Sequence, residues 1–386
     1  MVPNKYLQID YNVHPDFQFG DQCWNLEHDL VREFNEIYVQ IHAAITVFNR
    51  NRLLELIDHI FVSLSVDVDN DADLKFIHLL RLEVERLMQS HLRFYSKITN
   101  PRVNQSMNFA EPKSWKSGIV SGATLNRLNK LTKKSVKLLI QKSQFGEGDR
   151  ASLSISSGWS ILRLTRILNR EFSRSQVLEY VGQLVPYNVK VVGVALELST
   201  DNPSWWKHEG LNQTDPKTKY AHFDEGIESP KAIVYLSKVG MSNGPFSYYP
   251  YLFEQLDLSP FQLLVSRCIG NVAQQMFGSI ADSVRPTSTT TFRRLYMKLP
   301  REIRSNSHFG WDVIPNSNLE SVMTTSETFL LGDAGTFIVF DGPNIVHRGG
   351  MVEEGQRIAL QVIFGHRSLR KELLSIVSFI VRRISK

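Results

Sequence analysis

Residues 335–365 carry the sequence GTFIVFDGPNIVHRGGMVEEGQRIALQVIFG. Two runs rich in β-branched and aromatic residues, GTFIVFD (335–341) and RIALQVIFG (357–365), stand at its ends, with Gly, Pro and Asn between them. Runs of this kind, bounded by turn residues, are typical of strands. The intervening GGMVEEGQ (349–356) contains three glycines. It predicts a chain reversal that lays the second run beside the strand leading to His347.

Further runs of the same character occur upstream. They are VKVVGVALELS (189–199), AIVYLSKV (232–239) and FRRLYMKL (292–299), with turn residues between them. Several short strands separated by Gly, Pro and Asn indicate an antiparallel sandwich or barrel. The segment PFQLLVSRCIGNVAQQMFGSIADS (260–283) has helical character and predicts an insertion into this β domain.

The first part of the chain has a different texture. Residues 25–100 place apolar side chains at three- and four-residue spacing, as do residues 123–143, which predicts amphipathic helices. Residues 100–122, richer in Pro, Ser, Gly and Asn, are interpreted as a loop, and a Gly- and Ser-containing break is expected near 144–158. The amphipathic segment ILRLTRILNREF then leads into the first strand of the β domain.

The whole chain is therefore expected to be an α+β protein. We predict a helical N-terminal region over residues 1–150, a jelly-roll-like β domain over 151–366, and a basic amphipathic helix over 367–386. The 386 residues have 42% hydrophobic and 22% charged content, which is ordinary for a globular protein.

The net charge of +5 comes from the end of the chain. Residues 367–386 hold six basic side chains and one acidic one, and this surplus equals that of the whole sequence. A nucleic-acid groove on the main body is therefore not expected. Two cysteines far apart suit a reducing compartment. No apolar run approaches the ~20 residues of a membrane span, and the N-terminus lacks the apolar core of a signal peptide. We expect a cytoplasmic protein.

The C-terminal segment LRKELLSIVSFIVRRISK places Leu369, Leu373, Ile380 and Ile384 at helical spacing, with basic residues at both ends. Such a helix could lie on an anionic membrane surface. Docking onto the protein itself or onto a second subunit, as in a homodimer, is the commoner use and the favoured interpretation.

Two His-x-Asp triplets occur in the chain. The first, His14-Pro15-Asp16, contains a proline that disfavours a central strand, and it is set aside. In the second, His222-Phe223-Asp224, an extended backbone would direct His222 and Asp224 to the same face. An imidazole and a carboxylate together suit ferrous iron. By themselves these two residues could be a structural pair, a histidine bonded to a neighbouring carboxylate. A third ligand elsewhere in the chain is therefore needed to indicate a metal site.

His347 is the best candidate for that ligand, because it ends the run GTFIVFDGPNIVH. Arg357, ten residues later, is expected to enter the same site. Its guanidinium offers a rigid fork for a carboxylate such as the distal one of 2-oxoglutarate. Three protein ligands would leave three positions on an iron(II) ion, two for the 2-oxo acid and one for dioxygen beside a substrate.

These motifs resemble the phytanoyl-CoA dioxygenase family. The resemblance covers roughly residues 190–365 and rests on YAHFD (220–224), on AIVYLSKVGMSNGPFSYYP (232–250) and on FDGPNIVHRGGMVEEGQRIALQVIF (340–364). It implies a double-stranded β-helix, iron(II), 2-oxoglutarate, and hydroxylation of a small or medium organic molecule with release of succinate and carbon dioxide. The chain departs from the family at 246–251, FSYYPY, where a Pro-Gly-Ser-His element is common.

Two other kinds of protein stay open at this point. One is a β-barrel binding protein that retains a metal site without turnover, and the other is a cupin-type metalloenzyme that needs no 2-oxo acid. Arg357 separates them from the oxygenase, because neither requires a guanidinium at that place. Asp224 favours hydroxylation over halogenation, since related halogenases replace this carboxylate with a small residue.

Overall fold

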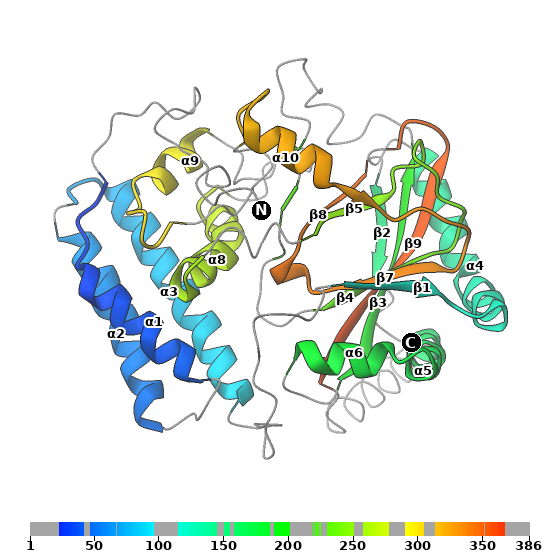
Figure 1. The fold of residues 1–386 in the computed structure, drawn as a ribbon, viewed down its shortest axis with the longest axis horizontal. Helices are drawn as coiled ribbons and strands as arrows, with labels where there is room; N and C mark the ends of the chain where they lie inside the picture. Colours follow the sequence, from blue (N-terminus) through cyan, green and yellow to red (C-terminus); the bar gives the residue numbers. More distant parts are fainter. Residues whose placement is uncertain are drawn as a thin grey trace, which may run out of the picture. The chain divides into compact units, whose positions relative to one another are not determined.

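A computed structural model gives the fold of the chain (Figure 1). It describes residues 23–41, 47–66, 68–95, 115–144, 150–154, 158–185, 189–200, 218, 221–222, 224, 230–250, 258–277, 290–304, 313–350 and 352–366. The chain divides into two compact units, each made of several segments. The first comprises Met1–Ser106, Glu209–Ile227 and Tyr249–Glu327, and the second comprises Met107–His208, Glu228–Tyr248 and Thr328–Lys386.

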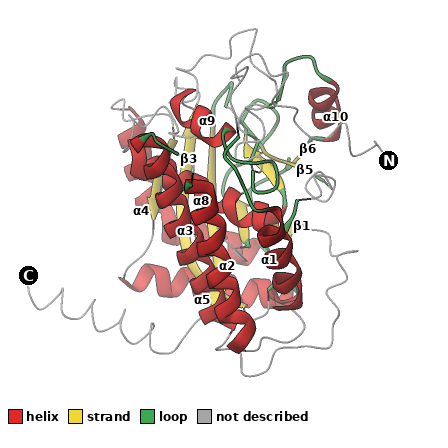
Figure 2. Cartoon of the chain, turned by 90° about the vertical axis from the view of Figure 1, so that its left-hand side faces the viewer, coloured by secondary structure: helices red, strands yellow, loops and turns green. Residues whose placement is uncertain are grey.

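The first unit is helical. Its described helices are α1 (His28–Ile41), α2 (Val47–Ser65), α3 (Asp71–Tyr95), α8 (Pro260–Phe277), α9 (Thr290–Met297) and α10 (Asn318–Ser326). Figures 1 and 2 show α1, α2, α3 and α8 lying side by side, and α8 packs on α3 and α1 although it is distant from both in sequence. Each contributes an apolar stripe to one shared core, which includes Phe34, Phe61, Phe76 and Phe261.

Local capping fixes where α3 begins. The side-chain oxygen of Asn70 accepts hydrogen bonds from the backbone N–H groups of Ala72 (2.8 Å) and Asp73 (3.4 Å), which satisfies two donors that the first turn leaves without helical partners. Asp73 is itself paired with Lys298, just after α9, at 2.7 Å. This contact ties the start of α3 to a segment more than two hundred residues later.

The second unit is built on a six-stranded sheet in the order β1-β7-β4-β9-β3-β2, and every neighbouring pair is antiparallel. The strands are β1 (Trp115–Ile119), β2 (Arg150–Ser154), β3 (Val189–Thr200), β4 (Lys231–Tyr235), β7 (Thr336–Phe340) and β9 (Gln356–His366). A three-stranded sheet has the order β6-β5-β8, with β5 (Phe246–Tyr249), β6 (Thr328–Phe329) and β8 (Val346–Gly349).

Alternation along the central strands gives the large sheet two apolar faces. In β7, Phe337 and Val339 join one core cluster, whereas Ile338 and Phe340 join another. The first cluster lies against α4 (Gly122–Gln144), α5 (Gly158–Arg174) and α6 (Val177–Leu184), which cover that face. The second cluster contains aromatic residues of β4 and β5, so it joins the large sheet to the small one. Because side chains of a strand alternate in direction, a strand buried on both faces must be apolar throughout.

A buried carboxylate holds the start of α4. Glu171 of α5 accepts hydrogen bonds from the Ser121 backbone N–H (2.6 Å), the Ser121 hydroxyl (2.9 Å) and the Thr124 hydroxyl (2.6 Å). Burial raises the pKa of Glu171, but these hydrogen bonds outweigh burial and lower the pKa below its ordinary value. A negative charge at a helix N-terminus is also favoured by the helix dipole.

Most expected elements are confirmed. As predicted, helices α1, α2 and α3 lie within residues 25–100 and α4 covers residues 123–143. Helix α8 begins at Pro260 as expected. The strands predicted over 189–199, 232–239, 335–341 and 357–365 correspond to β3, β4, β7 and β9. The mixture of helices with antiparallel sheet agrees with the expected α+β class.

The predicted strand over 292–299 is wrong, because this segment forms α9. Its apolar residues Phe292, Leu295, Tyr296 and Leu299 recur at three- and four-residue spacing and are all buried in the helical core. That period fits a helix face better than a strand, although the segment is also rich in aromatic residues. Several short strands were also missed. β1 lies within the expected loop, β2 lies within the expected break, and β5 and β6 lie outside every predicted strand.

In the described part of the chain, no helix combines the length and the apolar character needed to cross a membrane. The C-terminal segment 367–386, predicted to be a basic amphipathic helix, lies outside the described residues.

Candidate metal centre

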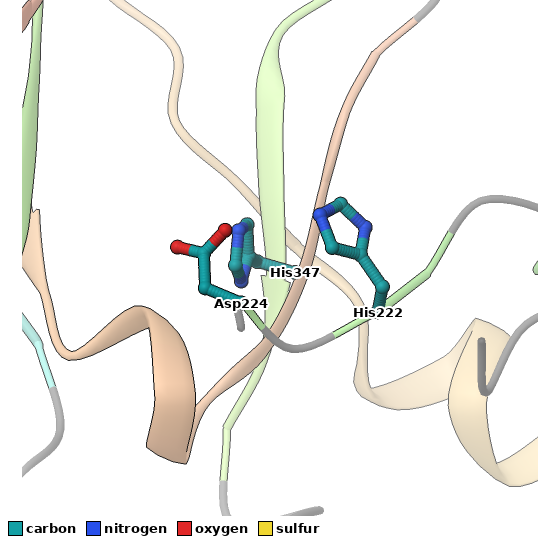
Figure 3. A group of neighbouring side chains, drawn as sticks. All are labelled: His222, Asp224 and His347. Atoms are coloured by element: carbon teal, nitrogen blue, oxygen red, sulfur yellow. The ribbon is translucent and has the colours of Figure 1, made fainter. Parts of the chain in front are cut away.

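Three of the predicted site residues come together. His222, Asp224 and His347 each offer one ligand atom, and these atoms all lie within 4.8 Å of one another (Figure 3). Atoms at these separations can all serve as ligands of one metal ion. The donors are two imidazoles and one carboxylate, the set that suits a ferrous ion with open coordination positions. The residues present therefore fit a metal of this kind.

His347 is held by its own chain. It lies in β8 directly after a short 3₁₀ turn, Gly342–Asn344, which Asp341 and Asn344 close through a backbone hydrogen bond (2.8 Å) and a side-chain hydrogen bond (2.7 Å). The Nδ1 atom of His347 lies 2.9 Å from the carbonyl oxygen of Ile345. A carbonyl can only accept, so Nδ1 carries the proton and Nε2 keeps the lone pair that a metal requires.

Aromatic rings fix the plane of the same imidazole. The ring of Phe340 lies 4.8 Å from that of His347, and the ring of Phe246 lies 5.6 Å from it, measured between centroids. Only 6% of the His347 surface is exposed. A ligand that is already oriented loses little conformational entropy when it binds a metal, which favours affinity.

Arg357 is buried, with 6% of its surface exposed, at the start of β9. One of its terminal nitrogens donates a hydrogen bond to the carbonyl oxygen of Gly244, and the other donates to the hydroxyl of Ser199 at 3.2 Å. Ser199 stands directly opposite Arg357 in the β3–β9 register. Both acceptors are neutral, so neither contact cancels the positive charge.

The positive charge of Arg357 affects the pKa of a neighbouring tyrosine, Tyr235. Burial raises the pKa of Tyr235, and the positive charge of Arg357 and the hydrogen bond from the Phe246 N–H partly oppose this rise. The Tyr235 hydroxyl accepts from that N–H at 2.9 Å and donates to the Leu330 carbonyl at 3.0 Å. The hydroxyl thus joins β4 to β5 and to the residue that follows β6.

Two expectations about how the site is assembled are wrong. His222 and Asp224 were predicted to share a strand, but both lie outside the named strands. The strand of Arg357 was predicted to pair with the strand of His347. Instead β9 pairs with β3 and β4 in the large sheet, whereas β8 belongs to the small sheet. The stretch 349–356 therefore connects a strand of the small sheet with a strand of the large sheet.

The sequence interpretation missed the groups that hold Arg357, namely the Gly244 carbonyl and Ser199. The signal that could have pointed to Gly244 is the Asn-Gly-Pro turn, because a glycine in such a turn indicates a special backbone conformation. His14 and Asp16 of the first His-x-Asp triplet lie outside the described part of the chain.

No protein-family model matches the chain, and no curated protein is similar to it. Solved structures give weak likenesses. The epimerase SnoN in complex with Fe3+, alpha ketoglutarate and nogalamycin RO shares 10% identity over 65% of this chain and 78% of its own, with a TM-score of 0.33. EctD from S. alaskensis with 2-oxoglutarate and 5-hydroxyectoine shares 12% sequence identity over 69% of this chain and 81% of its own, with a TM-score of 0.34.

HygX from Streptomyces hygroscopicus, with nickel and 2-oxoglutarate bound, shares 9% identity over 68% of this chain and 86% of its own, with a TM-score of 0.34. Scores this low do not establish a shared fold. The evidence for the candidate site is therefore its own side chains. Two histidines and an aspartate lie close enough to hold one ion, and a buried arginine lies in the unit that contains His347.

Proposed function

We propose that this protein is an iron(II)- and 2-oxoglutarate-dependent oxygenase that hydroxylates a small or medium organic molecule. The observation that carries the proposal is the convergence of the His222, Asp224 and His347 ligand atoms within 4.8 Å. Ferrous iron held by these residues would supply the activation of dioxygen, coupled to oxidation of the 2-oxo acid.

A second observation supports a 2-oxo acid in particular. Arg357 bonds to the Gly244 carbonyl, and the ring of Phe246 packs on His347. Gly244 and Phe246 are two residues apart, so at most about 7 Å of chain separates them. The guanidinium and the imidazole thus lie against one short segment. The five-carbon chain of 2-oxoglutarate, chelating at one end and ionic at the other, matches this arrangement of a metal ligand and a cation.

The reaction balances with these components. One oxygen atom of dioxygen enters a C–H bond of the substrate to give an alcohol. The other enters 2-oxoglutarate, which loses carbon dioxide and becomes succinate. In this scheme the His222, Asp224 and His347 side chains hold the ion, Arg357 orients the co-substrate through its distal carboxylate, and the aromatic rings around His347 exclude water.

The proposal also includes the type of β fold, the cellular location and the partners of the protein. The antiparallel six-stranded sheet and the smaller three-stranded sheet support a double-stranded β-helix of the kind implied by the resemblance to the phytanoyl-CoA dioxygenase family. A reducing, cytoplasmic location would keep iron ferrous, and neither Cys23 nor Cys268 is part of a disulfide. The partners we propose are dioxygen and a small-molecule substrate, with a homodimer as the assembly to test.

Anaerobic titration tests the proposal. Adding iron(II) and then 2-oxoglutarate to the protein should produce the weak visible charge-transfer band of a 2-oxo acid chelated to ferrous iron. Arg357→Gln should require more 2-oxoglutarate to reach the same band, whereas Lys190→Gln, an exposed cation on the neighbouring strand β3, should not. Folded protein that gives no band at any 2-oxoglutarate concentration would favour a metal-retaining binding protein or a cupin-type enzyme.

A further inference from the structure

The Asn-Gly-Pro turn lies against the loop that leads into β9. Ser242 accepts hydrogen bonds through its carbonyl from the N–H groups of Glu353 (2.8 Å) and Glu354 (3.0 Å). The Gly350 N–H donates to the Pro245 carbonyl at 3.0 Å. The two loops are thus joined along their length, just before the residue whose guanidinium reaches back to Gly244.

One side chain connects the turn to that loop. The Asn243 Oδ1 atom accepts from the Gly240 N–H at 2.9 Å, which closes its own turn, and the Asn243 Nδ2 atom donates to the Glu354 carbonyl at 2.9 Å. A backbone bridge between Asn243 and Val352 adds to the same contact. An amide is suited to this place because it donates and accepts at once, whereas a carboxylate only accepts.

The backbone next to Asn243 requires glycine. Gly244 has φ 68°, the left-handed region that L side chains rarely adopt. This conformation points its carbonyl at Arg357, which lies three residues beyond Glu354. Asn243 therefore fixes the acceptor and, through Glu354, the strand that carries the donor.

We propose that Asn243 is a positioning residue for Arg357. By bonding to both Gly240 and Glu354, it sets the Gly244 carbonyl against the guanidinium and so directs the rest of the fork toward the distal carboxylate of 2-oxoglutarate. The role as a co-substrate determinant rests on the proposed function, whereas the ordering of Arg357 does not.

The test compares Asn243→Ala with Asn243→Asp and with Met241→Ala, a control in the same turn whose side chain is 56% exposed. Removing the amide should raise the 2-oxoglutarate concentration at half-saturation about tenfold, the equivalent of one hydrogen bond of about 1.4 kcal/mol, with turnover at saturation changed less than about twofold. Asn243→Asp should behave as Asn243→Ala does, because it lacks the donor for Glu354. Met241→Ala should match the wild type.

Coupling distinguishes positioning from general damage. In an Arg357→Lys background, Asn243→Ala should weaken 2-oxoglutarate binding less than about twofold further, because the fork that Asn243 positions is already gone. A fully additive loss would overturn the proposal. So would unchanged 2-oxoglutarate affinity of Asn243→Ala in a wild-type background.

A second readout needs no co-substrate. NMR of protein labelled with ¹⁵N-arginine reports on the Arg357 guanidinium, whose signals are assigned by their absence in Arg357→Lys. These signals should show restricted rotation of the guanidinium in the wild type. In Asn243→Ala the guanidinium should rotate freely and its N–H signals should average. If the wild type fails to bind 2-oxoglutarate, the proposed function falls, and these signals alone decide whether Asn243 orders Arg357. Restricted rotation that survives in Asn243→Ala would reject the positioning role.

Discussion

The guanidinium of Arg357 donates a hydrogen bond to the carbonyl of Gly244, 113 residues earlier in the chain. Two residues after Gly244, the ring of Phe246 packs on the imidazole of His347. This short segment brings a buried cation and a proposed metal ligand to one place, although their strands belong to different sheets.

Replacing Asp224 with alanine should abolish metal-dependent turnover of 2-oxoglutarate, by about 100-fold or more, because removing a ligand costs more than the loss of a supporting contact. Folding should change little, since the side chain is not part of an apolar core cluster. Succinate formation and iron content measure the effect. Asp333→Ala, an exposed carboxylate in the unit of His347, is the control and should retain activity. Undiminished succinate formation by Asp224→Ala would remove Asp224 from the site.

Replacing Arg357 with glutamine should lower the affinity for 2-oxoglutarate about 10- to 100-fold, because a charge-assisted hydrogen bond contributes about 1.5–3 kcal/mol. Iron binding should persist, since the arginine is not one of the ligand residues. Binding of iron(II) and of 2-oxoglutarate is measured separately, with Lys190→Gln as the matched loss of a cation. Equal affinities of Arg357→Gln and wild type for 2-oxoglutarate would mean that another group holds the co-substrate.

Replacing Glu171 with glutamine should lower the free energy of unfolding by about 1–3 kcal/mol at pH 7, because the carboxylate accepts three hydrogen bonds at the start of α4. The pKa of Glu171 is lowered in the folded protein. Its contribution to stability is therefore present above the ordinary glutamate pKa of about 4.3 and is lost as the pH falls through the folded pKa.

Urea unfolding at a series of pH values checks this dependence. The difference between wild type and Glu171→Gln should shrink as the pH drops below about 4.3. Glu179→Gln, which changes an exposed carboxylate on α6, should show no comparable difference at pH 7. A gap between wild type and Glu171→Gln that stays constant down to acid pH would show that the charge of Glu171 contributes nothing.

Replacing Gly350 with alanine should destabilise the contact between the Asn-Gly-Pro turn and the loop before β9. The added Cβ would lie 2.3 Å from the Pro245 carbonyl oxygen, which belongs to the backbone and cannot rotate away. We expect a loss of about 1–3 kcal/mol in the free energy of unfolding.

Gly182→Ala is the matched control, because its Cβ meets nothing within 4 Å and the residue lies inside α6. That change should stabilise the protein by about 0.5–1 kcal/mol, since alanine loses less backbone entropy in a helix. Thermal unfolding of both variants gives the comparison. A neutral Gly350→Ala would mean that the two loops can separate without cost.

Local pattern was enough to predict part of this protein. The α1 to α4 segments and the strands β3, β4, β7 and β9 follow from hydrophobic period, because each buries an apolar face that its own residues define. His222, Asp224 and His347 were recognisable as candidate metal ligands because an imidazole–carboxylate mixture suits ferrous iron. Arg357 was recognisable as a candidate carboxylate-binding residue because its fork suits a carboxylate.

Tertiary structure decided the rest. The sequence of α9 has both aromatic content and helical period, and its packing in the helical core selects the helix. Strand β1, with Ser117 and Gly118 in its middle, is poor in strand formers and depends on β7 for its hydrogen bonds. The contacts of Arg357 with Gly244 and Ser199 join residues far apart in the chain, and no local period encodes such a pairing. Side-chain chemistry could be inferred from composition and spacing, but which backbone carbonyl faces which guanidinium depends on how the two sheets and their loops pack.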